Sequence, residues 1–337
     1  MKLAKNIELP SKYLDCYEAA LVTILKYMGL PNESYLIGTQ TFFYFIDGPN
    51  GAKILARFNQ IQDEWEYIFN IFIKHVPIAN EVSFRNEILS RLDDHMPVCL
   101  PTDLFFLPYT PHYLRLHQTH FINIFGYEDD RYFVVCPYYR YEGWLDADCI
   151  KKSFFSLVSS FSQNILFIPT LELQKLTTDK VQNLIHESCQ NMLGLRTPIK
   201  LEGVDPKYLG LMGIGTFSLY LKQIFIAHTA MPLNNDFLDL SRHLISVGNS
   251  RYWFYKLIEQ YQQDLFSIEV AINLQKKFDD LVLLWRGIGH MLGISVHTNK
   301  LEKVESVILY LENAYEQEKR LFSYMLSLLP DYEEGLL

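Results

Sequence analysis

The segment YLDCYEAALVTILKYMGL (residues 13–30) carries the strongest structural signal in the chain. After Cys16, apolar residues recur at the three- and four-residue spacing of an amphipathic helix, and Gly29 supplies a stop signal. Asp15 is a residue type that caps helix N-termini. The pattern therefore predicts a helix over 16–30 whose first residue is a cysteine.

A cysteine in the first turn of a helix can be a nucleophile, because unpaired N–H groups and the helix dipole favour a thiolate. It can equally be a small buried residue that packs like alanine. Cysteine catalysis also needs a base. His120 is the strongest candidate, because it opens the apolar strand HFINIFGY (120–127), although a strand histidine can also serve only structure. His112 and His117, in the preceding loop, are looser candidates.

The first half of the chain mixes helix and strand patterns. Ser83 is suited to cap a helix, and Glu128-Asp129-Asp130 form a turn between two strand-like runs. Residues 37–48 are predicted to be a strand or a strand-like loop. The patterns that follow predict a helix, a strand, a hairpin, a helix and a closing strand over residues 83–97, 98–109, 120–139, 145–156 and 164–170.

The patterns in the second half of the chain predict helices and no strands. Beyond a helix that starts near residue 172, helical patterns cover 207–227, 236–247, 251–262, 265–293 and 300–329. The sequence thus predicts an α+β protein with a catalytic domain over 1–172 and an all-helical domain over 175–337.

Composition excludes several function classes. The chain has 337 residues, 49% of them hydrophobic, and a net charge of −9 without any run of basic residues, so nucleic-acid binding is not expected. Charges interrupt the apolar stretches and the N-terminus has no apolar signal region, so we expect no membrane contact and a cytoplasmic location. The five cysteines form no CxxC pair, which indicates free thiols. No metal site is expected, because His290 and His297 lack a third ligand.

Two segments carry a family resemblance. DCYEAALVTILKYMGLP (15–31) and HFINIFGYEDDRYFVVCP (120–137) resemble the cysteine and histidine segments of the bacteriocin-processing cysteine peptidases. Most of the chain resembles the butirosin biosynthesis protein H family. The further segments that carry this resemblance are SYLIGTQTFFYF (34–45), PTDLFFLPYTPHYLRLHQTHFINIFGY (101–127), GNSRYWFYKLIEQY (248–261) and LLWRGIGHMLG (283–293).

The resemblance implies a papain-like N-terminal domain and a helical domain that covers its active site. It further implies acyl transfer in natural-product biosynthesis, with Cys16 as nucleophile and His120 as base. The acyl donor would be the phosphopantetheine arm of an acyl carrier protein or peptidyl carrier domain. The acceptor would be a small-molecule amine or hydroxyl, no cofactor of the chain's own is implied, and a homodimer stays open.

Two positions depart from the family pattern. Cys136 stands where an aspartate would orient the histidine, so Asp103, Asp146 or Asp148 could take that role, Cys136 itself could take it, or it could be a core residue. The related peptidases place an oxyanion-hole glutamine shortly before the cysteine, where this chain has Pro10. The remaining oxyanion or pocket candidates are Asn6, Lys12, Tyr13, Tyr17 and Arg251.

Two other functions stay open at this point. A thiol hydrolase or cyclase on the same scaffold would share the nucleophile and differ in the acceptor. A catalytically degenerate binding or scaffold protein would be consistent with the cysteine at position 136.

Overall fold

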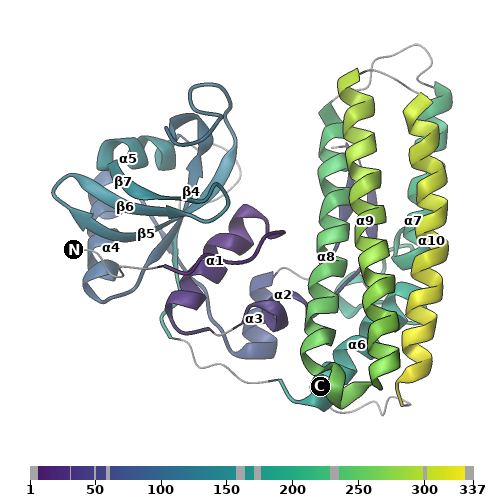
Figure 1. Cartoon of the computed structure of the whole chain (residues 1–337). Helices are drawn as coiled ribbons and strands as arrows, with labels where there is room; N and C mark the ends of the chain where they lie inside the picture. The colour runs from purple at the N-terminus through teal and green to yellow at the C-terminus, as the bar shows by residue number, and fades with distance from the viewer. Residues whose placement is uncertain are drawn as a thin grey trace. The chain divides into compact units, whose positions relative to one another are not determined.

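The chain folds into two compact units. The computed structural model describes residues 7–30, 32–48, 51–57, 61–156, 164–170, 176–227, 235–298 and 302–330. One unit, here called the sheet unit, comprises Met1–Glu33 and Ile61–Gln174; the other, the helical unit, comprises Ser34–Gln60 and Lys175–Leu337 (Figure 1).

An antiparallel six-stranded sheet forms the sheet unit, in the order β3-β8-β4-β5-β6-β7. Its strands are β3 (Lys74–Pro77), β4 (Val98–Asp103), β5 (Thr119–Glu128), β6 (Arg131–Cys136), β7 (Tyr141–Asp146) and β8 (Asn164–Phe167). Its helices are α1 (Cys16–Tyr27), α3 (Ile61–Phe69), α4 (Glu81–Asp93) and α5 (Ala147–Phe155).

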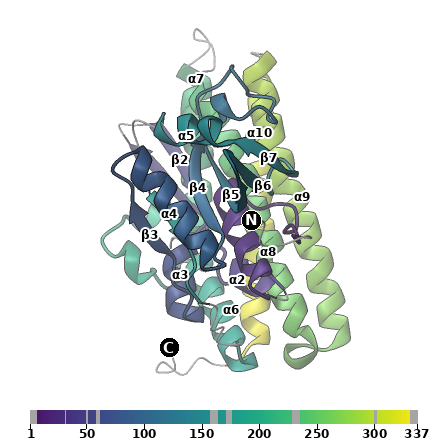
Figure 2. The same cartoon turned by 90° about the vertical axis from the view of Figure 1, so that its left-hand side faces the viewer.

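Helices cover both faces of this sheet. Because side chains alternate along a strand, Ile122 and Ile124 of β5 lie on one face, where they pack with residues of α4 and α5. Figure 2 looks onto the face that α4 covers. Asn123 points to the other face and donates its Nδ2–H to the Ala20 carbonyl of α1 at 2.8 Å. The sheet is therefore sandwiched between α1 on one side and α4 with α5 on the other.

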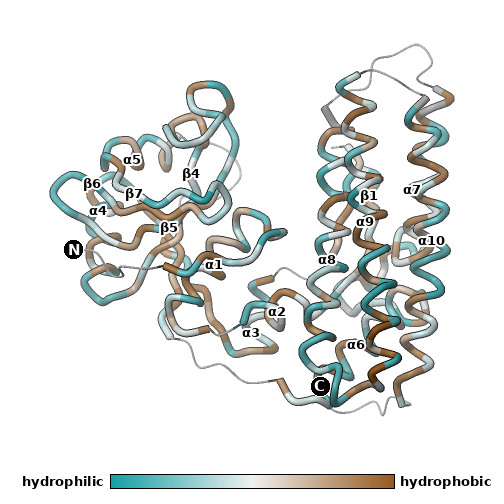
Figure 3. The backbone as a smooth tube through the Cα atoms, viewed as in Figure 1, coloured by the Kyte–Doolittle hydropathy of each residue, from teal (hydrophilic) through white to brown (hydrophobic). Residues whose placement is uncertain are grey.

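The helical unit combines long helices with a small hairpin. Its helices are α2 (Ser34–Ile37), α6 (Thr178–Leu193), α7 (Gly210–Ala227), α8 (Asn235–Leu265), α9 (Ile268–Thr298) and α10 (Glu302–Leu328), and its hairpin is β1 (Tyr44–Gly48) with β2 (Gly51–Leu55). Hydrophobic and hydrophilic residues alternate along the long helices, whereas β5 is mostly hydrophobic (Figure 3). No helix in the described ranges has the length and apolar character needed to cross a membrane.

The predicted α+β class is confirmed, and the predicted hairpin over 120–139 is the β5–β6 pair. The helix predicted over 83–97 begins earlier. Asn80 is its N-cap, and Ser83 is the reciprocal partner in a capping box. Two short edge strands, β3 and β7, have no counterpart in the sequence prediction, because their residues lack a regular alternation of apolar side chains.

The sequence predicted one division of the chain, at residues 172–175, which would place segment 34–60 in the first domain. In the structure this segment belongs to the helical unit. The Phe43 ring stacks on Trp285 of α9 with centroids 5.5 Å apart, and the Phe43 carbonyl accepts the Gly210 N–H of α7 at 2.8 Å. Phe45 packs on Phe217, 5.3 Å between centroids. Phe42, Phe43 and Phe45 are buried in the core of this unit, and the β1–β2 hairpin makes the unit mainly and not entirely helical.

Helix α8 is continuous, although the sequence predicts two helices over 236–247 and 251–262. Gly248 is the reason for the difference. A Cβ atom at this position would lie 3.2 Å from the Trp285 Cβ and from the Val282 carbonyl of α9. The glycine therefore serves the close packing of two helices and does not end one.

Candidate active site

Cys16 is the first residue of α1, and a capping box closes this helix end. The Asp15 carboxylate accepts the Glu18 N–H at 2.7 Å, and the Glu18 carboxylate accepts the Asp15 N–H at 3.2 Å. The predicted N-cap at Asp15 is confirmed. The Phe121 N–H of β5 points at the Cys16 sulfur and favours its charged form. The helix start thus places the thiol beside the strand that carries His120.

Contacts of the next helical turns fix α1 on β5. The Tyr17 ring meets the Phe121 ring edge-on, with centroids 4.8 Å apart, and the Tyr17 hydroxyl donates to the Gln62 side chain at 2.9 Å. The buried bond from Asn123 to the Ala20 carbonyl adds a second attachment. Tyr17, a predicted pocket residue, is therefore a half-buried packing residue next to the thiol.

His120 is buried in the sheet, opposite Thr102 of β4, with 2% of its surface exposed. Its Nε2 lies 3.1 Å from the Cys136 sulfur. The rings of Tyr138 and Tyr139 pack against the imidazole, with centroid distances of 5.7 and 5.1 Å. Cys136 therefore occupies the position at which the sequence pattern places an orienting aspartate.

Burial decides the charge states of this cluster. Burial, with the Asp15 carboxylate next in importance, raises the pKa of the Cys16 thiol to about 12. Burial, with a smaller contribution from His112, lowers the pKa of His120 to about 4. In the described part of the chain no hydrogen bond joins the side chains of Cys16 and His120. The resting site thus holds a thiol and a neutral imidazole and not an ion pair.

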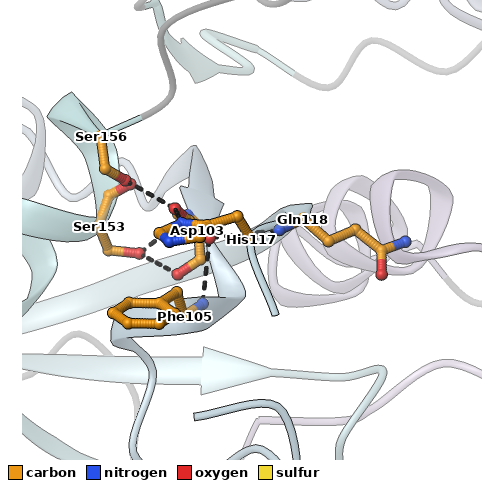
Figure 4. A network of polar contacts seen from close by, with 6 residues as sticks. All are labelled: Asp103, Phe105, His117, Gln118, Ser153 and Ser156. Atoms are coloured by element: carbon orange, nitrogen blue, oxygen red, sulfur yellow. Dashed lines mark hydrogen bonds and ion pairs between the residues drawn. The ribbon is translucent and has the colours of Figure 1, made fainter. Parts of the chain in front are cut away.

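A second polar network surrounds the Asp103 carboxylate, which is 2% exposed (Figure 4). One carboxylate oxygen accepts the N–H groups of Phe105 at 3.0 Å and Gln118 at 3.3 Å. The other accepts the Ser156 hydroxyl at 3.0 Å and the His117 Nδ1–H at 2.7 Å. The His117 ring stacks on Phe105 with centroids 4.1 Å apart, and its side chain is 66% exposed.

Asp103 therefore orients His117, and not His120 as the sequence suggested it could. Both of its oxygens are occupied at the end of β4, and the ring nitrogen of His120 turns to Cys136 instead. Burial alone would raise the pKa of Asp103, but the bonds from His117, Phe105 and Ser156 hold that pKa below its usual value. The network closes the loop between β4 and β5, where the Leu104 N–H also donates to the Gln118 carbonyl at 3.0 Å.

Asp103→Asn should destabilise the sheet unit by about 1–3 kcal/mol, because the new amide cannot accept the His117 and Ser156 bonds. Exchange of the Leu104 amide, measured by hydrogen–deuterium exchange on the full chain, should become faster. Asp148→Asn is the control, since the Asp148 side chain is 75% exposed and, among the described residues, forms an ion pair with Lys151 alone, at 2.8 Å. Unchanged exchange at Leu104 would contradict a clamping role for Asp103.

Asp146 and Asp148 lie away from His120. In the β6–β7 register, Asp146 pairs with Arg131, whereas Cys136 pairs with Tyr141 at the opposite end of the hairpin. The five residue steps of β6 from Arg131 to Cys136 span about 16 Å. Neither carboxylate therefore replaces the orienting residue, because Asp146 lies at the far end of the hairpin and Asp148 follows it in the first turn of α5.

Of the other predicted pocket residues, the structure describes Lys12, Tyr13 and Arg251. Asn6 lies outside the described residues, and Lys12 is exposed. Tyr13 has a left-handed backbone (φ 81), which bulky residues rarely adopt, and its side chain is 41% exposed. Arg251 is fully buried in the helical unit, where Glu318 of α10 accepts its Nε–H at 2.9 Å. Its donors serve the core of that unit, so a pocket role is not supported.

Sequence reasoning missed two features of the site. The first is the pairing of His117 with Asp103, for which the only local signal was an aspartate before a short turn. The second is the group of tyrosines around Cys136: Tyr109, Tyr138 and Tyr139. Two of these lie two and three residues after Cys136, but nothing local indicates that Tyr109 joins them.

Residues 15–137 match the family model described as "Butirosin biosynthesis protein H, N-terminal". The matched range contains Cys16, His120 and Cys136, and the predicted resemblance to this family is confirmed for it. No match was found among the curated proteins.

Proposed function

We infer that residues 15–137 form an N-terminal region of the butirosin biosynthesis protein H type. On this basis we propose that the chain is a cysteine-dependent acyltransferase of antibiotic biosynthesis. Its donor would be an acyl thioester on the phosphopantetheine arm of an acyl carrier protein or peptidyl carrier domain. Its acceptor would be a small-molecule amine or hydroxyl.

The observation that carries the proposal is the placement of Cys16 against β5. A helix start and the Phe121 N–H both favour negative charge on this sulfur, and His120 is the residue just before Phe121. The lowered pKa of His120 keeps its ring in the basic, uncharged form at neutral pH. A nucleophile and a base are therefore carried by a helix and by the strand on which that helix packs.

The reaction would proceed in two half-reactions. In the first, the Cys16 sulfur bonds to the acyl carbon while His120 takes the thiol proton; the thioester C–S bond breaks, and the leaving pantetheine sulfur takes that proton. In the second, His120 takes a proton from the acceptor, the acceptor nitrogen or oxygen bonds to the acyl carbon, and the bond to Cys16 breaks. The Cys16 sulfur then recovers the proton from His120.

The raised pKa of Cys16 affects the timing of the first step. Because the resting pair is uncharged, the thiol proton would move to His120 as the sulfur attacks. Negative charge then passes from the sulfur to the thioester carbonyl oxygen. The Cys16 backbone N–H, which points to the side chain of its own residue, would be a helix donor for such an anion.

Intact-mass spectrometry of the full chain tests the proposal. Incubation with the acetyl or glycyl thioester of N-acetylcysteamine should add one acyl group to the wild type and none to Cys16→Ala. Cys149→Ala is the matched control, because Cys149 is also a partly exposed thiol of the sheet unit, bonded to the Phe106 carbonyl at 2.9 Å. An adduct that persists in a folded Cys16→Ala variant would refute the proposal.

The products separate the proposed transferase from a hydrolase or cyclase. Release of free acid or of a cyclic acyl product without an added amine would favour the latter two. One observation favours a degenerate binding protein, namely that the described structure contains no hydrogen bond between Cys16 and His120. The hypothesis of a degenerate binding protein predicts that neither thioester forms an adduct.

A further inference from the structure

The buried contact between His120 and Cys136 follows from the pairing of their strands. Asn123 pairs with Val135 in the β5–β6 register, so Cys136 comes opposite Ile122, and His120 is its diagonal neighbour on the same face. The His120 Nε2 and the Cys136 sulfur are 3.1 Å apart, and the two residues are 2% and 0% exposed. The sheet therefore holds this nitrogen against a sulfur from which water is excluded.

Donors surround the Cys136 sulfur. The backbone N–H groups of Tyr138 and Tyr139, in the turn after β6, point at it, and the Tyr109 hydroxyl lies beside it. A sulfur that faces several donors acts as a hydrogen-bond acceptor. The fourth neighbour is the His120 Nε2. It can form a hydrogen bond with an accepting sulfur only if it carries a proton, so that the Nε2–H is the donor.

We propose that Cys136 is a positioning residue for His120: its sulfur accepts the Nε2–H and leaves Nδ1 as the free basic nitrogen. This inference rests on the proposed function, because a free Nδ1 matters only if Cys16 gives up a proton. The thiol thus takes the structural place of the orienting carboxylate of a cysteine–histidine–aspartate site, with a weaker acceptor and without its charge.

The absence of a carboxylate fits the electrostatics of the cluster. Burial raises the pKa of the Cys136 thiol, and burial also raises the pKa of Tyr139 to about 12, so neither supplies negative charge at neutral pH. His112 also lowers the pKa of His120, since a positive charge on His112 would repel an imidazolium at position 120. Tyr138 packs edge-on over the ring. His120 consequently stays neutral, and Cys136 orients it without charging it.

Selective ¹⁵N-histidine NMR on the full chain tests the proposal directly. In the wild type at pH 7, the His120 ring should be the tautomer protonated at Nε2. Cys136→Ala removes the acceptor, so the ring should shift toward a mixture with the Nδ1-protonated form. The rate of adduct formation with the acetyl thioester should then fall by roughly tenfold or more, as is usual when an orienting partner is lost.

Cys136→Asp should keep an acceptor for the His120 Nε2–H and add a negative charge. A carboxylate next to an imidazole favours the charged form, so the pKa of His120 should rise by at least about one unit. The acid limb of the pH–rate profile for adduct formation should move upward by the same amount. A variant that changed only packing would move neither quantity in this way.

Cys99→Ala is the matched control, because Cys99 is equally buried but pairs with Asn123 and so belongs to the opposite face of the sheet. It should leave the His120 tautomer unchanged. If Cys136→Ala fails to fold, Cys136→Ser, which retains an acceptor, should keep the Nε2 tautomer, and loss of that tautomer would oppose the proposal. An Nδ1-protonated ring in the wild type would overturn it. Because these spectra need no turnover, they decide the role of Cys136 even if Cys16 forms no adduct.

Discussion

Arg251→Met is expected to lower the free energy of unfolding of the helical unit by about 3–5 kcal/mol, since it leaves a buried carboxylate without its counterion. The Arg251 and Glu318 side chains are both 0% exposed. Methionine keeps an unbranched apolar chain in place of the arginine stem, so the expected loss comes mainly from charge and hydrogen bonds. Few single substitutions in this chain should cost more.

The Arg251 guanidinium joins distant parts of the helical unit. Its Nε–H donates to Glu318 of α10 at 2.9 Å, and its Nη1 donates to the Thr41 hydroxyl at 2.9 Å and to the Phe42 carbonyl at 2.6 Å. The same Glu318 oxygen accepts the Trp285 Nε1–H of α9 at 2.6 Å. One buried ion pair therefore ties segment 34–60 to three helices of the unit.

Far-UV circular dichroism during urea unfolding of the full chain measures this effect, because the long helices dominate the signal. Arg242→Met on the same helix is the control: its side chain is 64% exposed and bonded to Asp239, so a loss below about 0.5 kcal/mol is expected. The double variant Arg251→Met with Glu318→Leu should recover much of the loss. Equal losses for Arg251→Met and Arg242→Met would contradict the assignment.

Acidification from pH 7 to pH 4 should destabilise the sheet unit by about 3 kcal/mol through His120 alone. The ordinary pKa of this histidine is 6.5, and burial lowers it to about 4 in the folded chain. Between these values the unfolded chain binds a proton that the folded chain does not bind. The stabilising contribution is thus complete above about pH 6.5 and is lost as the pH falls toward the folded value.

His120→Asn should remove most of this slope between pH 6.5 and 4, as measured by urea unfolding with tryptophan fluorescence at several pH values. Its control is His75→Asn, because His75 of β3 is exposed and its lowered pKa has less effect after solvent screening. The lowered pKa of Asp103 acts below pH 4 and so falls outside this window. An unchanged slope in His120→Asn would show that other groups cause the acid sensitivity.

Local patterns in the sequence were sufficient to predict the helix and the hairpin that carry the candidate site. The helix start at Cys16 depended on Asp15 and Glu18, which close the capping box within one turn. The β5–β6 hairpin depended on two apolar runs and the short turn between them. Since strand register follows from such a hairpin, the nearness of Cys136 to His120 could be predicted as well.

Long-range contacts decided the features that the sequence analysis did not find. Segment 34–60 carries a strand pattern that would suit either unit, and it joins the helical unit because its aromatic side chains pack on α7 and α9 there. Gly248 has the appearance of a helix end, yet close approach of α9 explains it. Arg251 resembled a pocket residue until Glu318, distant in sequence, proved to be its partner.

The sequence by itself determined that a cysteine opens a capped helix and that a histidine and a second cysteine lie on neighbouring strands. The first depends on residues within one helical turn, and the second depends on a hairpin with a short turn. Only the tertiary structure decided that Asp103 holds His117 and leaves His120 to Cys136. The physical reason is that the competition between two histidines for one carboxylate depends on how the loop between β4 and β5 closes. That closure is a three-dimensional property that no local pattern encodes.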